Sequence, residues 1–222
     1  MPSCEYIFFD LDGTLTDPGI GITNSVMYAL QHYGIFVSDR SELYKFIGPP
    51  LIDSFQTYYG FSHEQAKEGV AFYREYFTDR GIFENEVYPG IPETLQRLKA
   101  AGKRLLVATS KPEPFAEQIM EHFGLADYFD VVAGAAFDET RTQKWEVIDY
   151  ALDRIGVTDR KSVLMVGDRE HDVLGAEKCG LVGCIGVLYG YGSRSELEQA
   201  GAVAYAETPA QIADIILNSY TE

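Results

Sequence analysis

The chain has 222 residues, a formal net charge of −16 and an isoelectric point near 4.6. A surplus of negative charge of this size argues against nucleic acid polymers and anionic membrane surfaces as partners, because both are polyanions. Any phosphate group that the chain binds must therefore meet a locally positive site. The length is sufficient for one full domain and a small accessory one, with a substantial buried core.

The first predicted element is a strand over the apolar run Tyr6–Phe9, which a polar turn follows at once. Asp10 and Asp12 lie two residues apart in this turn, directly before Gly13 and Thr14. A strand that ends in two carboxylates cannot bury both charges without compensation, and a bound cation is the simplest compensation. One carboxylate can attack phosphorus, and the other can protonate the leaving alkoxide and then deprotonate a water. The pattern therefore indicates phosphoryl transfer.

Residues from about 19 to 86 show helical periodicity and no convincing strand. A capping-box pattern at Ser62 and Gln65 predicts the start of one helix in this stretch. Two earlier sets of apolar residues also recur at helical spacing. These sets are Ile22, Val26, Ala29, Leu30 and Tyr33, and then Leu51, Ile52, Phe55 and Tyr59. The stretch is interpreted as an inserted all-α module.

From residue 88 onward, short apolar strands alternate with helices, which favours a parallel sheet with helices on both faces. The predicted strands are Arg104–Ala108, Asp130–Ala133, Ser162–Val166 and Val182–Val187. The predicted helices are Glu93–Ala100, Pro114–Phe123 and Gln143–Ile155, each followed by a glycine that can end it, and a last helix that begins at Thr208-Pro209.

The carboxyl ends of the predicted strands carry polar side chains, and ligands of open parallel sheets bind at those ends. Thr109 and Ser110 follow the second strand, at a helix N-terminus, where hydroxyl groups favour an anionic oxygen. Lys144 opens the helix after the third strand. Asp168 and Asp172 follow the fourth, and their hard oxygen atoms suit Mg²⁺. Taken singly, Thr109 is typical of a helix cap and Lys144 of a surface lysine; the order of all these features favours a site.

The complete pattern resembles the haloacid dehalogenase-like superfamily, in which Asp-x-Asp-Gly-Thr marks the phosphatase branches. The resemblance covers nearly the whole chain. It implies an α/β fold with a Rossmann-like parallel sheet core, helices on both faces, and an inserted all-α helical cap. The core would comprise residues 1–16 and 88–222, and the cap residues 17–87.

The resemblance also implies the roles of the site residues. Asp10 would be the nucleophile and Asp12 the general acid and base, while Thr109 and Lys144 would hold the transferring phosphoryl group. The implied cofactor is Mg²⁺, bound by Asp10, Asp168 and the backbone carbonyl of Asp12, with Asp172 orienting a bound water or Lys144. The substrate-binding candidates are Ser110 and Arg141 in the core and Lys45, Gly48 and Arg74 in the cap.

The implied activity is Mg²⁺-dependent hydrolysis of a small phosphate monoester, enclosed beneath the cap, through an aspartyl-phosphate intermediate. Segments 15–25 and 46–51 most resemble the 5′-nucleotidase-like and phosphoglycolate phosphatase-like branch. One alternative is a sugar phosphomutase, which the lack of an arginine between Phe46 and Phe55 disfavours. The other is a non-catalytic binding module, since fold does not fix function. A monomer or a homodimer is expected.

The cysteines and the apolar segments indicate the compartment. Cys4, Cys179 and Cys184 are odd in number and lack the paired spacing of a zinc site, so buried reduced thiols are expected. No apolar segment approaches the length of a membrane span, and the N-terminus lacks a basic region before a long apolar run. A cytoplasmic protein is therefore expected.

Overall fold

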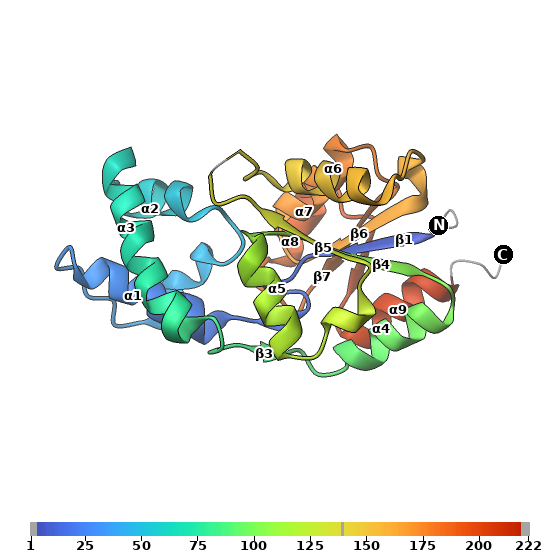
Figure 1. Cartoon of the computed structure of the whole chain (residues 1–222), viewed down its shortest axis with the longest axis horizontal. Coiled ribbons are helices and arrows are strands. Elements are labelled where there is room, and N and C mark those ends of the chain that lie inside the picture. Colours follow the sequence, from blue (N-terminus) through green and yellow to red (C-terminus); the bar gives the residue numbers. More distant parts are fainter. Residues whose placement is uncertain (1–3, 139, 219–222) are drawn as a thin grey trace. The chain divides into compact units, whose positions relative to one another are not determined.

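The computed structural model describes residues 4–138 and 140–218. The chain divides into two units, and a six-stranded sheet lies at the centre of one of them (Figure 1). The sheet unit contains the chain up to Thr16 and again from Val87, and the second unit spans Asp17–Glu86. The cap was expected over residues 17–87. All pairings of the large sheet are parallel, which confirms the predicted α/β class.

The strand order β5-β4-β1-β6-β7-β8 places β1 in the interior of the sheet. Ile7 of β1 pairs with Leu105 of β4 on one side and with Leu164 of β6 on the other. The carboxyl ends of β4, β1 and β6 therefore adjoin, at the kind of edge where open α/β sheets bind ligands. The strands are β1 Tyr6–Phe9, β4 Arg104–Pro112, β5 Val131–Ala135, β6 Val163–Gly167, β7 Gly183–Val187 and β8 Ala204–Ala206.

Helices cover both faces of the sheet, with α6 and α7 on one face and α4 and α9 on the other (Figure 1). Phe8 packs with Val147 and Val173 in the core on the α6 and α7 side. Ile7 and Phe9, which alternate with Phe8 along the strand, are fully buried as well. A strand covered on both faces reads as a continuous apolar run. The helices are α4 Ile91–Ala100, α5 Glu113–His122, α6 Lys144–Ile155, α7 Glu170–Lys178, α8 Arg194–Ala200 and α9 Pro209–Asn218.

Several elements of the sheet unit differ from their sequence prediction. Strand β4 continues to Pro112, past the predicted end at Ala108, because it shifts register there and pairs again with Ala135 of β5. Strand β8 and the helices α7 and α8 had no counterpart among the predicted elements. β8 has three residues and α8 has seven, so these two elements are too short to show a clear period.

The second unit is helical, as predicted, and its described core includes Val26, Leu30, Phe55 and Phe77. Two short strands, β2 at Thr16–Asp17 and β3 at Glu86–Val87, pair where the chain passes between the units. The helices are α1 Gly19–Gln31, the 3₁₀ segment η1 Arg40–Phe46, α2 Leu51–Tyr59, α3 His63–Tyr76 and the π-helical turn η2 Phe77–Gly81.

The three cysteines are free and buried, as the sequence predicted. Burial raises the pKa of the Cys179 thiol to about 12, which keeps it protonated and unreactive. In the described part of the chain, no helix combines the length and the apolar composition that crossing a membrane requires.

Helix α3 begins at the capping box that the sequence predicts. Gln65 N donates to Ser62 Oγ (3.2 Å), and Ser62 N donates to Gln65 Oε1 (3.0 Å). Two backbone donors that the first turn leaves without helical partners are thus satisfied.

We expect Ser62→Ala to lower the free energy of unfolding by about 1 kcal/mol, because it removes the acceptor for the Gln65 N–H. Ser62→Asp, which keeps a side-chain acceptor at this position, is expected to retain most of the stability. Urea unfolding of both variants measures the difference. An alanine variant as stable as the wild type would contradict this account of the helix start.

Candidate active site

The turn after β1 fixes the position of Asp10. Asp10 N donates to Val166 O (2.9 Å), which extends the pairing of β1 with β6 by one residue. Asp10 Oδ1 accepts from Leu11 N at 2.7 Å. The Leu11 carbonyl in turn accepts from three following backbone N–H groups, which closes a tight turn. The backbone of Asp10 is therefore held by β6, and its carboxylate by the N–H of the next residue.

Gly13 lets this turn pack against Asp168. Its φ of +80° lies in the left-handed region that side chains disfavour. A Cβ at this position would also stand 2.3 Å from Asp168 Oδ2. Both the backbone conformation and the available space therefore require glycine, and the close contact brings the end of β1 to the end of β6.

Three buried carboxylates, those of Asp10, Asp168 and Asp172, have oxygen atoms within 4.8 Å of one another. Asp168 Oδ2 accepts from Tyr191 N at 2.8 Å, whereas its Oδ1 is buried with no hydrogen-bond partner among the described residues. Burial, together with the charges of Asp172 and Asp10, raises the pKa of Asp168 well above its usual value.

Lys144 lies between two of these carboxylates. Its Nζ is 2.9 Å from Asp10 Oδ1 and 2.8 Å from Asp172 Oδ1, and it donates to Ala108 O at 3.1 Å. Burial alone would lower the pKa of Lys144, but the two carboxylates raise it above its ordinary value. The first residue of α6 is therefore a buried cation.

Asp12 has a different partner, Lys111 at the end of β4. Lys111 Nζ lies 2.8 Å from Asp12 Oδ2, and both residues are buried. Burial raises the pKa of Asp12, and the ammonium group opposes that rise. Lys111 was missed in the sequence, where the strand was expected to end at Ala108. The signal was the alternation of side chains, which puts residues 109 and 111 on one side if the strand continues.

The two hydroxyl candidates follow Ala108 on β4. Thr109 is buried, and its Oγ1 accepts from Lys111 N at 3.2 Å. Ser110 is half-buried. Both residues thus lie within β4, which pairs with β1, and not at the helix N-terminus where the sequence predicted them, because α5 begins only at Glu113.

Arg141 is engaged in contacts within the sheet unit. Its Nε donates to Gly134 O at 2.8 Å, a second nitrogen is 3.3 Å from Glu113 Oε2, and the guanidinium lies 3.7 Å from the Tyr150 ring centroid. These contacts join α5, β5 and α6. Its role in substrate binding stays a prediction.

The three cap candidates lie in the helical unit. The Lys45 ammonium is 4.6 Å from the Tyr58 ring centroid, a cation–π distance. Gly48 has a φ of +105° between η1 and α2, and Arg74 is half-buried on α3. Their roles in substrate binding stay predictions as well.

The donor set fits a divalent cation that prefers oxygen. The four carboxylates of Asp10, Asp12, Asp168 and Asp172 and the ammonium groups of two lysines leave an excess of two negative charges when all are ionised. The unpartnered Asp168 Oδ1 offers a ligand atom in the same cluster. Carboxylate oxygens of this kind suit Mg²⁺.

The loop after β7, which contains Tyr189 and Tyr191, packs against the cluster of buried carboxylates. Tyr189 Oη donates to Thr14 O at 2.9 Å, and Tyr191 N donates to Asp168 Oδ2 at 2.8 Å. Between them, a Cβ on Gly190 would stand 2.3 Å from Gly13 O and 2.4 Å from Asp168 Cβ. This loop therefore touches both acidic strand ends, a contact that the sequence analysis did not anticipate.

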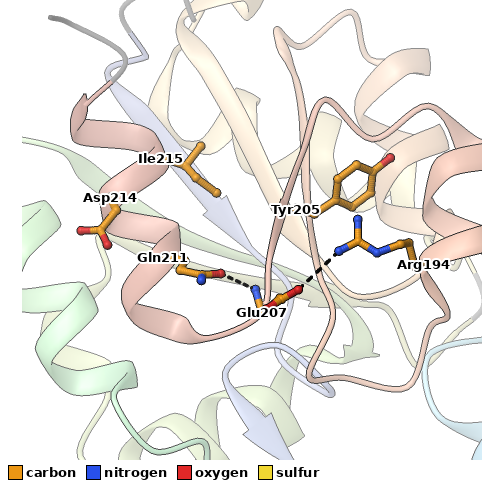
Figure 2. Close-up of a pocket in the computed structure, with 6 residues that line it drawn as sticks. All are labelled: Arg194, Tyr205, Glu207, Gln211, Asp214 and Ile215. Atoms are coloured by element: carbon orange, nitrogen blue, oxygen red, sulfur yellow. Dashed lines mark hydrogen bonds and ion pairs between the residues drawn. The ribbon is translucent and has the colours of Figure 1, made fainter.

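A separate pocket of about 360 Å³ lies between α8, β8 and α9 (Figure 2). Its polar groups bind one another: Arg194 lies 3.6 Å from Glu207 Oε1, and Glu207 N donates to Gln211 Oε1 at 2.6 Å (Figure 2). None of its lining residues belongs to the cluster of aspartates and lysines.

Comparisons with known proteins agree with this geometry. A family model described as haloacid dehalogenase-like hydrolase matches residues 7–187. The chain is 47% identical over 210 residues to a Pseudomonas aeruginosa protein named 5′-nucleotidase, covering 95% of this chain and 94% of that protein. It is 38% identical over 208 residues to the Mycobacterium tuberculosis protein named tyrosine-protein kinase PtkA, covering 93% of this chain and 70% of that protein. The crystal structure of a predicted phosphatase from Clostridium acetobutylicum has a TM-score of 0.94 and 47% identity, covering 97% of this chain and 99% of that one.

The chain therefore belongs to the haloacid dehalogenase-like hydrolases. Within that family it is a phosphoric monoester hydrolase, since the complete acidic motif accompanies close similarity to phosphatases. The resemblance found in the sequence is confirmed.

We expect Gly190→Ala to destabilise the sheet unit by roughly 1 to 3 kcal/mol, because its Cβ would meet backbone and Asp168 atoms. Gly69→Ala is the matched control. A Cβ on Gly69, in α3, would make ordinary contacts of about 3.5 Å with Phe55 of α2, so this variant should be neutral or slightly stabilised. Urea unfolding of both variants measures the difference, and equal stability would refute the proposed close packing of the loop.

Proposed function

We propose that the chain is a Mg²⁺-dependent phosphatase that hydrolyses a small phosphate monoester through an aspartyl-phosphate on Asp10. The observation that carries the proposal is the convergence of Asp10, Asp168 and Asp172 with Lys144, which lies 2.9 Å from the nucleophile. A carboxylate held beside a buried cation and two further carboxylates is arranged for phosphoryl transfer with a metal ion.

In the first step, Asp10 attacks phosphorus. Its Oδ1 is held by Leu11 N and Lys144, so the carboxylate meets the substrate in one orientation. A bond forms between the carboxylate oxygen and phosphorus, and the bond from phosphorus to the ester oxygen breaks. Asp12 gives its proton to the leaving oxygen. Thr109 and Lys144 hold the phosphoryl oxygens, whose charge they stabilise.

In the second step, a water molecule attacks the phosphorus of the aspartyl-phosphate. Asp12, now ionised, accepts the proton of that water. The bond between phosphorus and the Asp10 oxygen breaks, which releases inorganic phosphate and restores the carboxylate. The balance over both steps is one ester and one water consumed, and one alcohol and one phosphate released.

The metal would be held by Asp10, Asp168 and the backbone carbonyl of Asp12, with Asp172 orienting Lys144. Mg²⁺ in this place would supply positive charge to the phosphoryl oxygens. The contact of 2.8 Å between Asp172 and Lys144 supports the orienting role.

We infer that the substrate is a nucleoside monophosphate or another small ester of the phosphoglycolate kind. The 47% identity to a protein named 5′-nucleotidase supports the nucleotide first. We place the enzyme in the cytoplasm as a monomer or homodimer that acts on small molecules, in keeping with its acidic charge and free buried thiols.

We expect phosphate release from nucleoside monophosphates, phosphoglycolate, sugar phosphates or pyridoxal phosphate in the presence of Mg²⁺ and none with EDTA. Asp10→Asn should lower turnover at least about 10³-fold, since covalent catalysis is lost, while the fold persists. Asp153→Asn, on the exposed face of α6, is the matched control and should keep full activity. Full activity of Asp10→Asn would refute the mechanism. Phosphate moved within a sugar phosphate instead of being released would indicate a mutase.

We also expect Mg²⁺ to raise the thermal stability of the wild type. At about 100 times the dissociation constant, linkage gives roughly 2.7 kcal/mol. Asp168→Asn should lose this gain, yet be at least as stable as the wild type without metal, because it removes one buried charge from the acidic cluster. Thermal unfolding with and without Mg²⁺ measures both effects, and an unchanged Mg²⁺ response in the variant would exclude Asp168 as a ligand.

A further inference from the structure

Lys111 forms a buried ion pair to which the mechanism above gives no role. Its Nζ lies 2.8 Å from Asp12 Oδ2, and the two side chains are only 4% and 10% exposed. Water therefore screens the attraction between these two charges little. The second lysine of the cluster, Lys144, contacts Asp10 and Asp172 instead.

The backbone at Lys111 is fixed, which matters because a lysine side chain is flexible. Lys111 N donates to Thr109 Oγ1 at 3.2 Å, and the next residue, Pro112, pairs with Ala135 of β5. The two strands approach so closely that a Cβ on Gly134 would stand 2.6 Å from Lys111 O. The Lys111 side chain therefore extends from a backbone position that is fixed at the end of β4.

The pair leaves the two oxygens of Asp12 in different states. Oδ2 is held by the ammonium group, whereas Oδ1 is buried with no hydrogen-bond partner in the described part of the chain. A group that gives a proton to a leaving oxygen and later takes one from water needs one oxygen aimed at the reacting atoms. The ion pair supplies such a fixed carboxyl plane.

We propose that Lys111 is a positioning residue for Asp12, which holds Oδ2 so that Oδ1 exchanges the proton in both steps of the reaction. This inference rests on the proposed phosphatase mechanism. In this proposal, Lys111 supports proton transfer by Asp12, whereas Thr109 and Lys144 bind the phosphoryl group.

The proposal predicts a dependence on the leaving group. Alkyl phosphates need a proton on the leaving oxygen, whereas 2,4-dinitrophenyl phosphate releases a stable anion without one. Lys111→Met, which keeps an unbranched side chain one atom shorter and removes the charge, should lower kcat for alkyl esters about 10²-fold or more, with KM nearly unchanged. The first step with the dinitrophenyl ester should change by less than about threefold.

The second step gives an independent readout, because it needs Asp12 as a base for every substrate. With 2,4-dinitrophenyl phosphate, Lys111→Met should therefore show a burst of one dinitrophenolate per enzyme, followed by slow turnover as the aspartyl-phosphate accumulates. Lys111→Arg keeps the charge and should restore part of the alkyl-ester activity. The double variant with Asp12→Asn should be little slower than Asp12→Asn alone, because the two residues act as one unit.

The controls separate this inference from the proposed function. Lys99→Met, at an exposed position of α4, should leave all rates unchanged. An equal fall in the rate of the first step for both ester classes, the absence of a burst with 2,4-dinitrophenyl phosphate, or a raised KM with kcat unchanged would overturn the positioning role. Failure of the wild type to release phosphate, or full activity of Asp10→Asn, would overturn the phosphatase itself. If Lys111→Met does not fold, Lys111→Gln gives the same comparison.

Discussion

Four buried carboxylates at one edge of a sheet repel one another, and the placement of two lysines among them is the constraint on which the site depends. Each lysine comes from a different element: Lys144 from the first turn of α6 and Lys111 from the end of β4. If either lysine were shifted by one position in the sequence, a buried carboxylate would lose its partner. An unpaired buried charge destabilises a protein far more than the loss of a surface ion pair does. The start of α6 and the length of β4 thus each place one cation among the carboxylates.

The order of the strands makes this placement possible. With β1 between β4 and β6, acidic and basic groups that are distant in the chain meet at three adjacent strand ends. The loop after β7 then joins the ends of β1 and β6 from outside, through Tyr189 and the backbone of Tyr191. The site is therefore built from rigid strand ends and one bracing loop, an arrangement that suits a reaction in which the nucleophile must not move.

The sequence predicted those parts of the structure whose signal is local. The strand Tyr6–Phe9, the acidic turn after it and the capping box at Ser62 each lie within a few residues, and the alternation of elements is enough to predict a parallel sheet. Lys111 was missed because its meaning depends on a register shift in β4 and on a partner in another strand. The bracing role of Gly190 was missed for a similar reason: only the folded chain shows what a Cβ there would meet. The expected roles of Lys45, Gly48 and Arg74 in substrate binding rest on no local sequence pattern, and they stay predictions.

The direct pairing of β1 with β4, across the insertion in the sequence, has a consequence for how such a chain can diverge. The chain leaves the sheet unit at Thr16 and returns at Val87, and β1 and β4 on either side of the insertion pair directly with each other. The described pairings that hold the acidic strand ends in register, those of β1 with β4 and with β6, therefore lie outside the intervening segment. Selection can rewrite the helices of that segment, their lengths and their surfaces, while the chemistry at the sheet edge is inherited intact. The two parts of the gene are, in this sense, free to evolve at different rates.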